Sequence, residues 1–328
     1  MKKAVSLFFI AVGLLLSIPV ETSGKKKPAI DFWTVEESIL QLYREIRETK
    51  DDSLAIGLHR QIEEILAEAL VKPEAYKYKF DSLRMMGRIF ASRKDFCIFN
   101  WNHSSRDGTH RYFAVMVFPG KKGEPNRVIR LTETTDSIVR PDQQTLGPDQ
   151  WLGCLYYKIT PKRSGKDGKQ YCALLGLDMN NLKTKKKYVE ILSFDSDKTP
   201  QFGAPIIELN GWTKHRAIFE FSAQQSMYLE YNRLKRRIEM DHLAPLMPYL
   251  VGEYEYYEPD LYRDALKFKR GQWKHIKDIQ EPPKKNKSNK RSLPKPPKPN
   301  KSLFKNRENG GNKESGGNGR NRENGGNG

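Results

Sequence analysis

The sequence is poor in the features that mark several large protein classes. Only 3 of its 328 residues are cysteine, and 37% are hydrophobic. This composition excludes a small protein held together by disulfides and a multispan membrane protein. The chain also has no GxSxG, GxxxxGKS/T, HExxH or CxxC pattern. The signatures of α/β-hydrolases, P-loop proteins and common zinc sites are therefore missing.

The three cysteines, Cys97, Cys154 and Cys172, can form one disulfide at most. A strand reversal at residues 164–168 would pair position 154 with about 176, and position 172 with about 158. Cys154 and Cys172 would then not face each other, so we expect buried free thiols.

The N-terminus has the layout of an export signal. Two lysines precede an apolar run at residues 4–20, and small or polar residues follow at 22–24. We predict a signal peptide over residues 1–24 and an exported protein of the periplasm or the outer-membrane periphery. Because the run of 17 residues is at the lower limit for crossing a bilayer, an uncleaved N-terminal membrane anchor is the alternative.

The C-terminal residues 281–328 carry half of the net charge of +18. They hold 13 Lys or Arg against 4 Asp or Glu, which is 13 minus 4, or +9. Proline and lysine dominate the first half, and asparagine and glycine the second. With almost no apolar side chains to bury, this tail is predicted to be disordered, first as an extended spacer and then as flexible coil.

Two amphipathic helices are predicted in a helical segment at residues 25–75. Thr34 and Glu37 form a capping box for a helix over about 34–49, and Asp52 or Ser53 caps a second helix that ends before Pro73. The apolar residues at helical spacing are Val35, Ile39, Leu42, Tyr43 and Ile46 in the first helix, and Leu54, Leu58, Ile62, Ile65 and Ala69 in the second.

Residues 76–280 are predicted to be a β-rich domain, because the apolar period changes from 3.6 to 2 near residue 85. Ten or more short strands alternate with turn clusters, and no helical pattern is long enough for a βαβ crossover. The fold class is therefore mainly β, an antiparallel, meander-like sheet preceded by the helical pair. A barrel, a sandwich and an irregular propeller are all compatible with the pattern. The expected hairpin pairs are 96–101 with 111–118, 152–160 with 170–177, 188–194 with 206–209, 216–221 with 227–231, and 266–268 with 272–276.

Several phrases in this region are similar to those of a family of exported bacterial β-rich proteins. They are NWNHSSRDGTHRYFAV at 100–115, LYYKI at 155–159, LLGLDMNN at 174–181, FGAPI at 202–206, and RAIFEFS, YLEY and DHLAP between 216 and 245. The resemblance covers about residues 85–277. It implies an envelope location and a β-rich fold, and it carries no activity.

The candidate metal ligands have simpler roles in turns. His103 and His110 flank Asp107, but a three-ligand set without zinc spacing is weak, and an Asn/Asp/Gly turn explains it. Asp195 and Asp197 lack the further ligands of an EF-hand loop. The remaining turn acids and amides are Asp178, Asn180 and Asn181. We therefore predict no metal and no cofactor.

No catalytic residue can be assigned. Asp241, His242 and Glu239 are possible acid/base groups, but neighbours on a strand point to opposite faces unless a bulge intervenes. Residues 249–262 interleave five tyrosines with four acids, a composition that suits a sugar or a basic peptide. A loop held to the sheet by its own tyrosines is the favoured interpretation.

Basic residues near hairpin turns and in the tail are the candidate polyanion-binding site. They are Lys162, Arg163, Lys166, Lys185, Lys186, Lys187, Lys284, Lys285, Lys287, Lys290, Arg291, Lys295 and Lys298. Such a surface attracts nucleic acid, anionic lipids and acidic polymers alike. Nucleic acid is disfavoured, because Phe304 is the single aromatic residue of the tail and gives no stacking platform.

These features favour a noncatalytic envelope protein. It would be a structural or accessory subunit that docks on a protein complex, with the cationic tail as a tether to an anionic envelope polymer or lipid surface. The alternative is a secreted hydrolase or carbohydrate-active enzyme. A cleft with two carboxylates about 5 to 10 Å apart would favour the enzyme.

Overall fold

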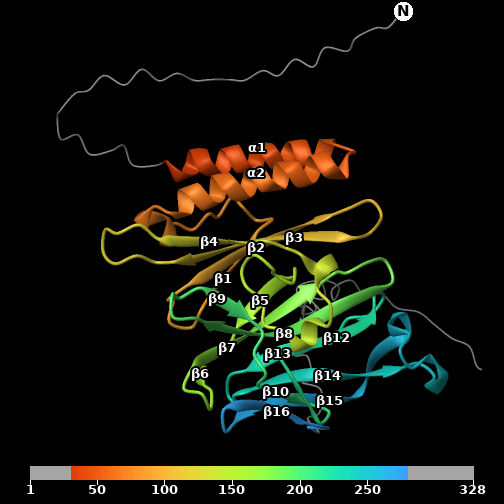
Figure 1. Ribbon diagram of the computed structural model, residues 1–328. Coiled ribbons are helices and arrows are strands. Elements are labelled where there is room, and N and C mark those ends of the chain that lie inside the picture. Colours follow the sequence, from red (N-terminus) through yellow and green to blue (C-terminus); the bar gives the residue numbers. More distant parts are fainter. Residues whose placement is uncertain (1–30, 280–328) are drawn as a thin grey trace, which may run out of the picture. The chain divides into compact units, whose positions relative to one another are not determined.

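A computed structural model describes residues 31–279, which belong to one compact unit (Figure 1). Two helices come first, and three β-sheets follow. The fold is mainly β with an N-terminal helical pair, as the sequence predicts. The predicted signal peptide and the predicted disordered tail lie outside the described residues.

The helices are α1, Phe32–Glu48, and α2, Asp52–Leu70. Each begins one turn or less from the predicted start, because an aspartate just ahead of it is the actual cap. Asp31 accepts the backbone N–H of Trp33, and Asp51 accepts the N–H groups of Ser53 and Leu54. The predicted capping box is wrong: the Thr34 hydroxyl donates to Asp31 at 2.9 Å instead.

The first sheet has the strand order β1-β2-β3-β4, and the helical pair covers one of its faces. Its strands are β1 Gly87–Phe90, β2 Cys97–Ser104, β3 His110–Phe118 and β4 Arg127–Leu131. The second sheet has the order β12-β8-β7-β5, with two short strands attached. Its strands are β5 Leu155–Ile159, β6 Arg163–Ser164, β7 Gln170–Asp178, β8 Thr184–Phe194, β9 Pro200–Phe202 and β12 Arg216–Ser222.

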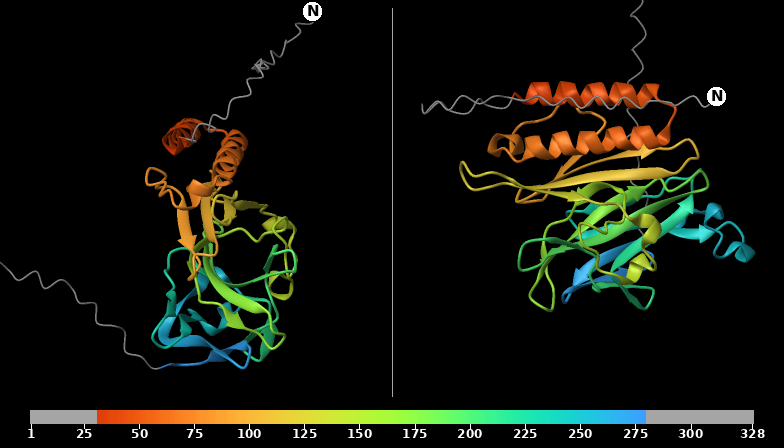
Figure 2. Two further views of the ribbon diagram at one scale, coloured as in Figure 1. Left: turned by 90° about the vertical axis from the view of Figure 1, so that its left-hand side faces the viewer. Right: turned by 45° about the horizontal axis from the view of Figure 1, so that its top comes forward.

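The third sheet has the order β11-β10-β16-β15-β14-β13. Its strands are β10 Ile207–Leu209, β11 Trp212–Lys214, β13 Leu229–Asn232, β14 Arg237–Pro245, β15 Tyr257–Lys269 and β16 Gln272–Ile276. Short 3-10 helices are Pro73–Tyr76, Thr135–Ser137, Pro141–Gln143, Pro248–Leu250 and Tyr254–Tyr256. Each sheet has two end strands, and the sheets stack as open layers (Figure 2). Of the arrangements that the sequence allows, the closed barrel is therefore excluded.

The helical pair and the three sheets make four layers, and an apolar core lies between each two neighbouring layers. Because side chains alternate between the two faces of a strand, a single strand contributes to two cores. On β3, Phe113 and Val115 pack toward the helices, whereas Ala114 and Met116 pack toward the second sheet. The same division holds on β7, where the residues toward the first sheet are Cys172 and Leu174, and those toward the third are Tyr171, Ala173 and Leu175. The central strands are therefore buried on both faces.

Most local hairpins were predicted correctly, and two pairings were wrong. β8 pairs with β7, β9 and β12, not with β10. β12 likewise pairs with β8 and not with β13. β10 pairs in parallel with β16, an exception to the antiparallel pattern. The pairs of β8 with β7 and with β9 are local hairpins, whereas those of β8 with β12 and of β10 with β16 join segments that are not neighbours in the chain, where turn signals carry no information.

All three cysteines are buried free thiols, as predicted. Leu155 pairs with Leu177 and Tyr156 with Gly176, close to the predicted register, so Cys154 and Cys172 lie at different positions along the hairpin. Among residues 31–279, no helix has the length and apolar character needed to span a membrane.

Candidate functional site

Three segments that are separate in sequence meet at one end of the protein, on the right-hand side of Figure 1. They are the β2–β3 turn, the β7–β8 turn and the outer part of the β14–β15 hairpin, residues 243–262, which we name the arm. Lys183 in the β7–β8 turn pairs with Glu255 of the arm at 3.0 Å. Leu182 packs so closely on Gly108 of the β2–β3 turn that an added Cβ would lie 2.3 Å from its Cγ.

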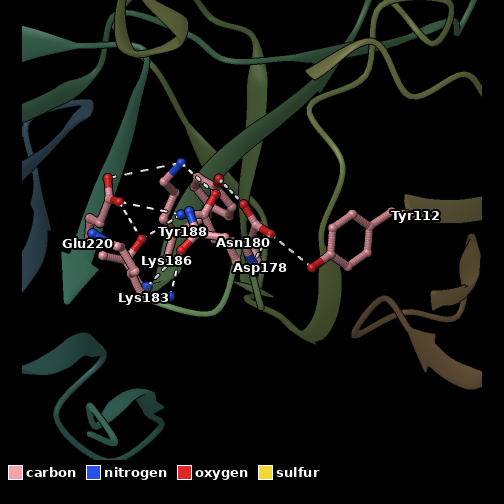
Figure 3. Close-up of polar contacts among 9 residues, drawn as sticks. Tyr112, Asp178, Asn180, Lys183, Lys186, Tyr188 and Glu220 are labelled. Carbon is pink, nitrogen blue, oxygen red and sulfur yellow. Dashed lines mark hydrogen bonds and ion pairs between the residues drawn. The ribbon is translucent and has the colours of Figure 1, made fainter. Parts of the chain in front are cut away.

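A buried polar group at this end is Asp178, the last residue of β7, which is only 4% exposed. Its carboxylate accepts hydrogen bonds from the hydroxyls of Tyr112 at 2.8 Å and Tyr188 at 2.9 Å, and from the N–H of Asn180 at 2.7 Å (Figure 3). Burial and the nearby Asp178 charge raise the pKa of both tyrosines, so both phenols remain hydrogen-bond donors. Because Tyr112 belongs to the first sheet, this contact fixes two sheets to each other.

A second group of contacts continues from the same turn to β12. Asn180, whose φ of 51° lies in the left-handed region, donates to Thr184, and the Thr184 hydroxyl donates to Glu220 at 2.6 Å. Lys186 donates to the Asn180 side chain at 3.1 Å and lies 4.0 Å from Glu220 (Figure 3). The polar groups of the turn are thus paired with one another, which suits a rigid support better than a catalytic centre.

A groove beside this turn contains two carboxyl groups, those of Glu63 and Glu133, whose pKa is raised by burial. A small cleft of about 160 Å³ is lined by Arg111, Glu133 and Asp178. It shares Arg111 and Glu133 with a larger groove of about 490 Å³ that runs under α2 past Glu63 and Arg130. Burial raises the pKa of Glu133, and raises that of Glu63 to about 7. The groove therefore holds a carboxyl group that can exchange a proton near neutral pH.

Sequence reasoning missed Glu63 and Glu133. Glu63 lies on α2 among charged residues, where helical periodicity assigns it to solvent. Glu133 precedes the Thr135–Ser137 turn and accepts the N–H of Tyr112 from the neighbouring β3 at 2.8 Å. Neither residue has a motif around it, so no sequence signal identifies the groove.

The arm carries an unusual exposed apolar surface. Its large exposed side chains, with their exposed fractions, are Leu246 53%, Met247 51%, Tyr249 81%, Val251 71%, Tyr254 44%, Tyr256 41%, Leu261 101% and Tyr262 57%. Among residues 31–279 there are 17 such side chains, and these eight fall within 17 consecutive positions. Single exposed apolar residues are ordinary, but eight in one hairpin are typical of a contact surface.

The prediction that residues 249–262 are a loop held to the sheet by its own tyrosines is only partly right. The Tyr257 hydroxyl accepts the N–H of Gly252 at 3.1 Å, and its ring lies 5.0 Å from that of Tyr254. The four other tyrosines of the stretch are exposed. Residues from Tyr257 onward also form the outer half of β15 rather than a loop.

The six predicted basic residues that lie in the described part of the chain do not form one open patch. Lys162 pairs with Asp95 and lies over the Phe96 ring, and Arg163 donates to the Tyr231 hydroxyl. Lys166 is exposed.

On β8, Lys186 faces Glu220, whereas half-buried Lys187 lies over the Tyr157 ring and has a lowered pKa because of burial. Lys185 is half-buried on the same strand. The seven tail residues, Lys284, Lys285, Lys287, Lys290, Arg291, Lys295 and Lys298, lie outside the described part of the chain.

The two histidines of the β2–β3 hairpin contact different residues. His103 contacts Asp52 at 3.2 Å, and His110 contacts Asn102 at 3.0 Å. Asp107 accepts the N–H and the hydroxyl of Thr109, which is the turn chemistry predicted. Over residues 31–279 no group of three His, Cys, Asp or Glu side chains is placed to hold a metal ion.

The remaining acid/base candidates are also separated. Asp195 accepts the N–H groups of Asp197 and Thr199, as an Asx turn does. A register shift does occur between Asp241 and Leu243, yet Asp241 pairs with Arg263 and His242 with Asp260. Glu239 accepts from Arg237 at 2.8 Å and from Asn232 at 3.0 Å.

Comparison with known proteins identifies no relative of this chain. No protein-family model matches the chain, and no curated protein or solved structure is significantly similar to it. The resemblance to exported bacterial proteins remains a prediction from the sequence.

Proposed function

We propose that the protein is a noncatalytic structural or accessory subunit of the cell envelope, and that it docks on a partner protein through the arm. The observation that carries this proposal is the apolar surface of the arm. Its eight exposed apolar side chains are far more concentrated than those elsewhere in residues 31–279. Burying such a surface against a partner is favourable by about 25 cal/mol per Å² of apolar area.

The position of the arm supports the same function. The three cores lie between the layers, and the exposed side chains of the arm belong to none of them. Lys183 of the β7–β8 turn pairs with Glu255 in the 3-10 turn of the arm, a contact that favours one position of the arm. A preorganised surface loses less entropy on binding.

Export and tethering complete the proposal. The N-terminal pattern supports export to the periplasm or the outer-membrane periphery, and the basic tail suits an anionic envelope polymer or lipid surface. N-terminal sequencing of protein from the envelope fraction tests export. A new terminus between about residues 20 and 25 is expected, and a cytosolic pool with intact Met1 would contradict it.

Docking is tested by replacing apolar residues on the arm. A Tyr249→Ser/Val251→Ser/Leu261→Ser variant and wild-type protein are used to capture a partner, which is then identified, purified and titrated by calorimetry. Affinity should fall at least about tenfold, which is about 1.4 kcal/mol. The matched control is Leu234→Ser, because Leu234 is 95% exposed in another turn. Equal affinity of the arm variant and the control would refute docking through the arm.

The groove under α2 favours one other candidate, the hydrolase. Glu63 and Glu133 line the same 490 Å³ groove, and both have a raised pKa. Release of soluble fragments from purified envelope polysaccharide by the wild-type protein, with loss of release in Glu63→Gln, would establish the enzyme. No release by wild-type protein would leave docking as the function.

A further inference from the structure

The groove under α2 is lined by three arginines that come from three different elements. Arg60 belongs to α2. Arg111 belongs to β3, two positions before Phe113, so it lies on the face of the first sheet that packs on the helices. Arg130 belongs to β4, opposite Val115, which packs on the same side. The three guanidinium groups therefore border one groove of about 490 Å³.

These guanidinium groups have few partners within the protein. Over residues 31–279, Arg60 forms no hydrogen bond and no ion pair. The Arg130 guanidinium lies 3.9 Å from the Glu64 carboxylate, which is too far for a hydrogen bond. Arg111 pairs with Asp136 at 2.7 Å, but both side chains are partly exposed to water, where such pairs contribute little. Each arginine therefore keeps N–H donors that a ligand can use.

The size and the walls of the groove suit a small molecule. Small-molecule sites typically have volumes of about 300 to 1,000 Å³, and this groove lies within that range. Ile56, Phe113 and Leu131 contribute apolar side chains to its walls. Guanidinium groups bind carboxylates through two parallel N–H donors. A ligand that carries several carboxylates on a compact carbon body would match both the cations and the apolar walls.

One carboxyl group of the groove can give up its charge when an anion enters. Glu63 accepts no hydrogen bond from any residue in the described part of the chain, and burial raises its pKa to about 7. The charged groups that act on it are Arg130 of β4, and Glu64 and Arg60 of α2. Both arginines lower its pKa, and Glu64 raises it. An anion bound beside Glu63 would raise this pKa further and favour the neutral form.

The other carboxyl group of the groove is held by the first sheet. Glu133 accepts the N–H of Tyr112 at 2.8 Å and the hydroxyl of Thr135 at 3.1 Å. Burial raises its pKa, whereas these two hydrogen bonds and the charge of Arg111 oppose that effect. Because Glu63 lacks such donors, a proton that is taken up together with an anion goes to Glu63.

We propose that the groove under α2 is a binding site for a small polycarboxylate, held by Arg60, Arg111 and Arg130. Binding takes up a proton at Glu63, so the affinity falls as pH rises through about 7. The site gives Glu63 a role other than that of a catalytic acid. It does not depend on docking through the arm.

Calorimetric titration of the full-length protein with benzene-1,3,5-tricarboxylate tests the site, in a buffer without other carboxylates or phosphate. The affinity at about pH 8 should be up to about tenfold lower than at about pH 6, because Glu63 is then mostly ionised. Glu63→Gln should keep the higher affinity at both pH values. Equal affinity of the wild-type protein at both pH values, or loss of binding in Glu63→Gln, would overturn the proposal.

The arginines are tested one at a time. Arg60→Gln and Arg130→Gln should each lower the affinity at least about fivefold, because each removes a charge-assisted contact. Arg47→Gln is the matched control, since it removes the same charge from an exposed position on α1. The basic tail is unchanged in all three variants, so a loss confined to the first two belongs to the groove. Equal affinities in the three variants would contradict recognition by these arginines.

Two comparisons separate the possible ligands and functions. Trigalacturonate carries its carboxylates along a sugar chain and should bind more weakly than the benzene tricarboxylate. Tighter binding of trigalacturonate would assign the groove to an acidic polymer and overturn a small ligand. The Tyr249→Ser/Val251→Ser/Leu261→Ser variant should bind the tricarboxylate as wild type does. No binding of the tricarboxylate by wild-type protein would disprove this inference and leave docking through the arm standing.

Discussion

The guanidinium of Arg216 donates through Nε to Oε2 of Glu190 at 2.8 Å, and both side chains are completely or almost completely buried between layers. Arg216 also donates to the carbonyl oxygens of Pro141 and Phe202. Arg216 therefore holds the Pro141–Gln143 turn and β9 against β12. Burial raises the pKa of Glu190, and Arg216 opposes that effect.

Removing one partner of this pair should be costly. Arg216→Met leaves the Glu190 carboxylate buried without its cation, so the free energy of unfolding should fall by about 3 to 5 kcal/mol. Arg216→Met combined with Glu190→Leu should recover part of the loss. Urea unfolding of both variants measures the difference, and equal losses would contradict an effect of uncompensated charge.

His59 should make the fold sensitive to acid. Its ring is buried, accepts the Trp101 indole N–H at 3.2 Å, and has a pKa lowered to about 4 by burial. Because the folded pKa is below the ordinary value of about 6.5, the stabilisation is present above pH 6.5 and is lost as pH falls toward 4. His59→Leu should reduce the loss of stability between about pH 7 and pH 5. Trp101→Phe should lower stability at both pH values and keep the same loss, and calorimetric melting temperatures compare the two.

Glu63 should have the opposite pH dependence. Its folded pKa of about 7 lies above the ordinary value of about 4.3, so the folded protein binds more protons than the unfolded chain between these values. Stability from this group falls as pH rises through about 7. Glu63→Gln should therefore be more stable than wild type at about pH 8 and similar at about pH 4. Glu64→Gln is the neighbouring exposed control, and an equal gain there would argue against burial as the cause.

Asp178→Asn should loosen the contact between the first two sheets. The amide nitrogen that replaces one carboxylate oxygen cannot accept from a tyrosine, so one of the hydroxyls of Tyr112 and Tyr188 loses its acceptor. The expected cost is about 1 to 3 kcal/mol. Asp195→Asn changes an exposed turn and should cost less than about 0.5 kcal/mol. Equal effects in urea unfolding would contradict a special role for Asp178.

Truncation after Gln280 should leave thermal unfolding nearly unchanged. Residues 281–328 offer almost no apolar side chains to a core. Scanning calorimetry of the full and shortened proteins measures this. A large fall in melting temperature would mean that the tail contributes to the core.

Local patterns predicted more of this structure than long-range contacts did. Helical spacing correctly placed Ile39, Tyr43 and Ile62 in the core, but it also assigned Leu54, which is 54% exposed in the first turn of α2. Turn residues located three of the five predicted hairpins correctly. They could not predict that β12 returns to β8, because that choice depends on which buried faces match after collapse.

The candidate site was harder to predict for the same reason. The turn around Asp178 is visible in the sequence, but its partner Tyr112 is 66 residues away. The composition of residues 249–262 is visible as unusual in the sequence. Their exposure arises because β14 and β15 extend as a hairpin past their neighbouring strands in the third sheet. The groove at Glu63 arises from the packing of α2 on the first sheet, which no local pattern encodes.

The order of the layers follows the order of the chain: the helices, the first sheet, most of the second and then most of the third. A chain that emerges from a ribosome or a translocation channel with its N-terminus first can therefore complete each layer on the one before it. Within residues 31–279, the return of β12 to β8 and the pairing of β10 with β16 are two exceptions that must wait for later segments. Folding during emergence would leave few unpaired strands exposed at any moment, which limits aggregation.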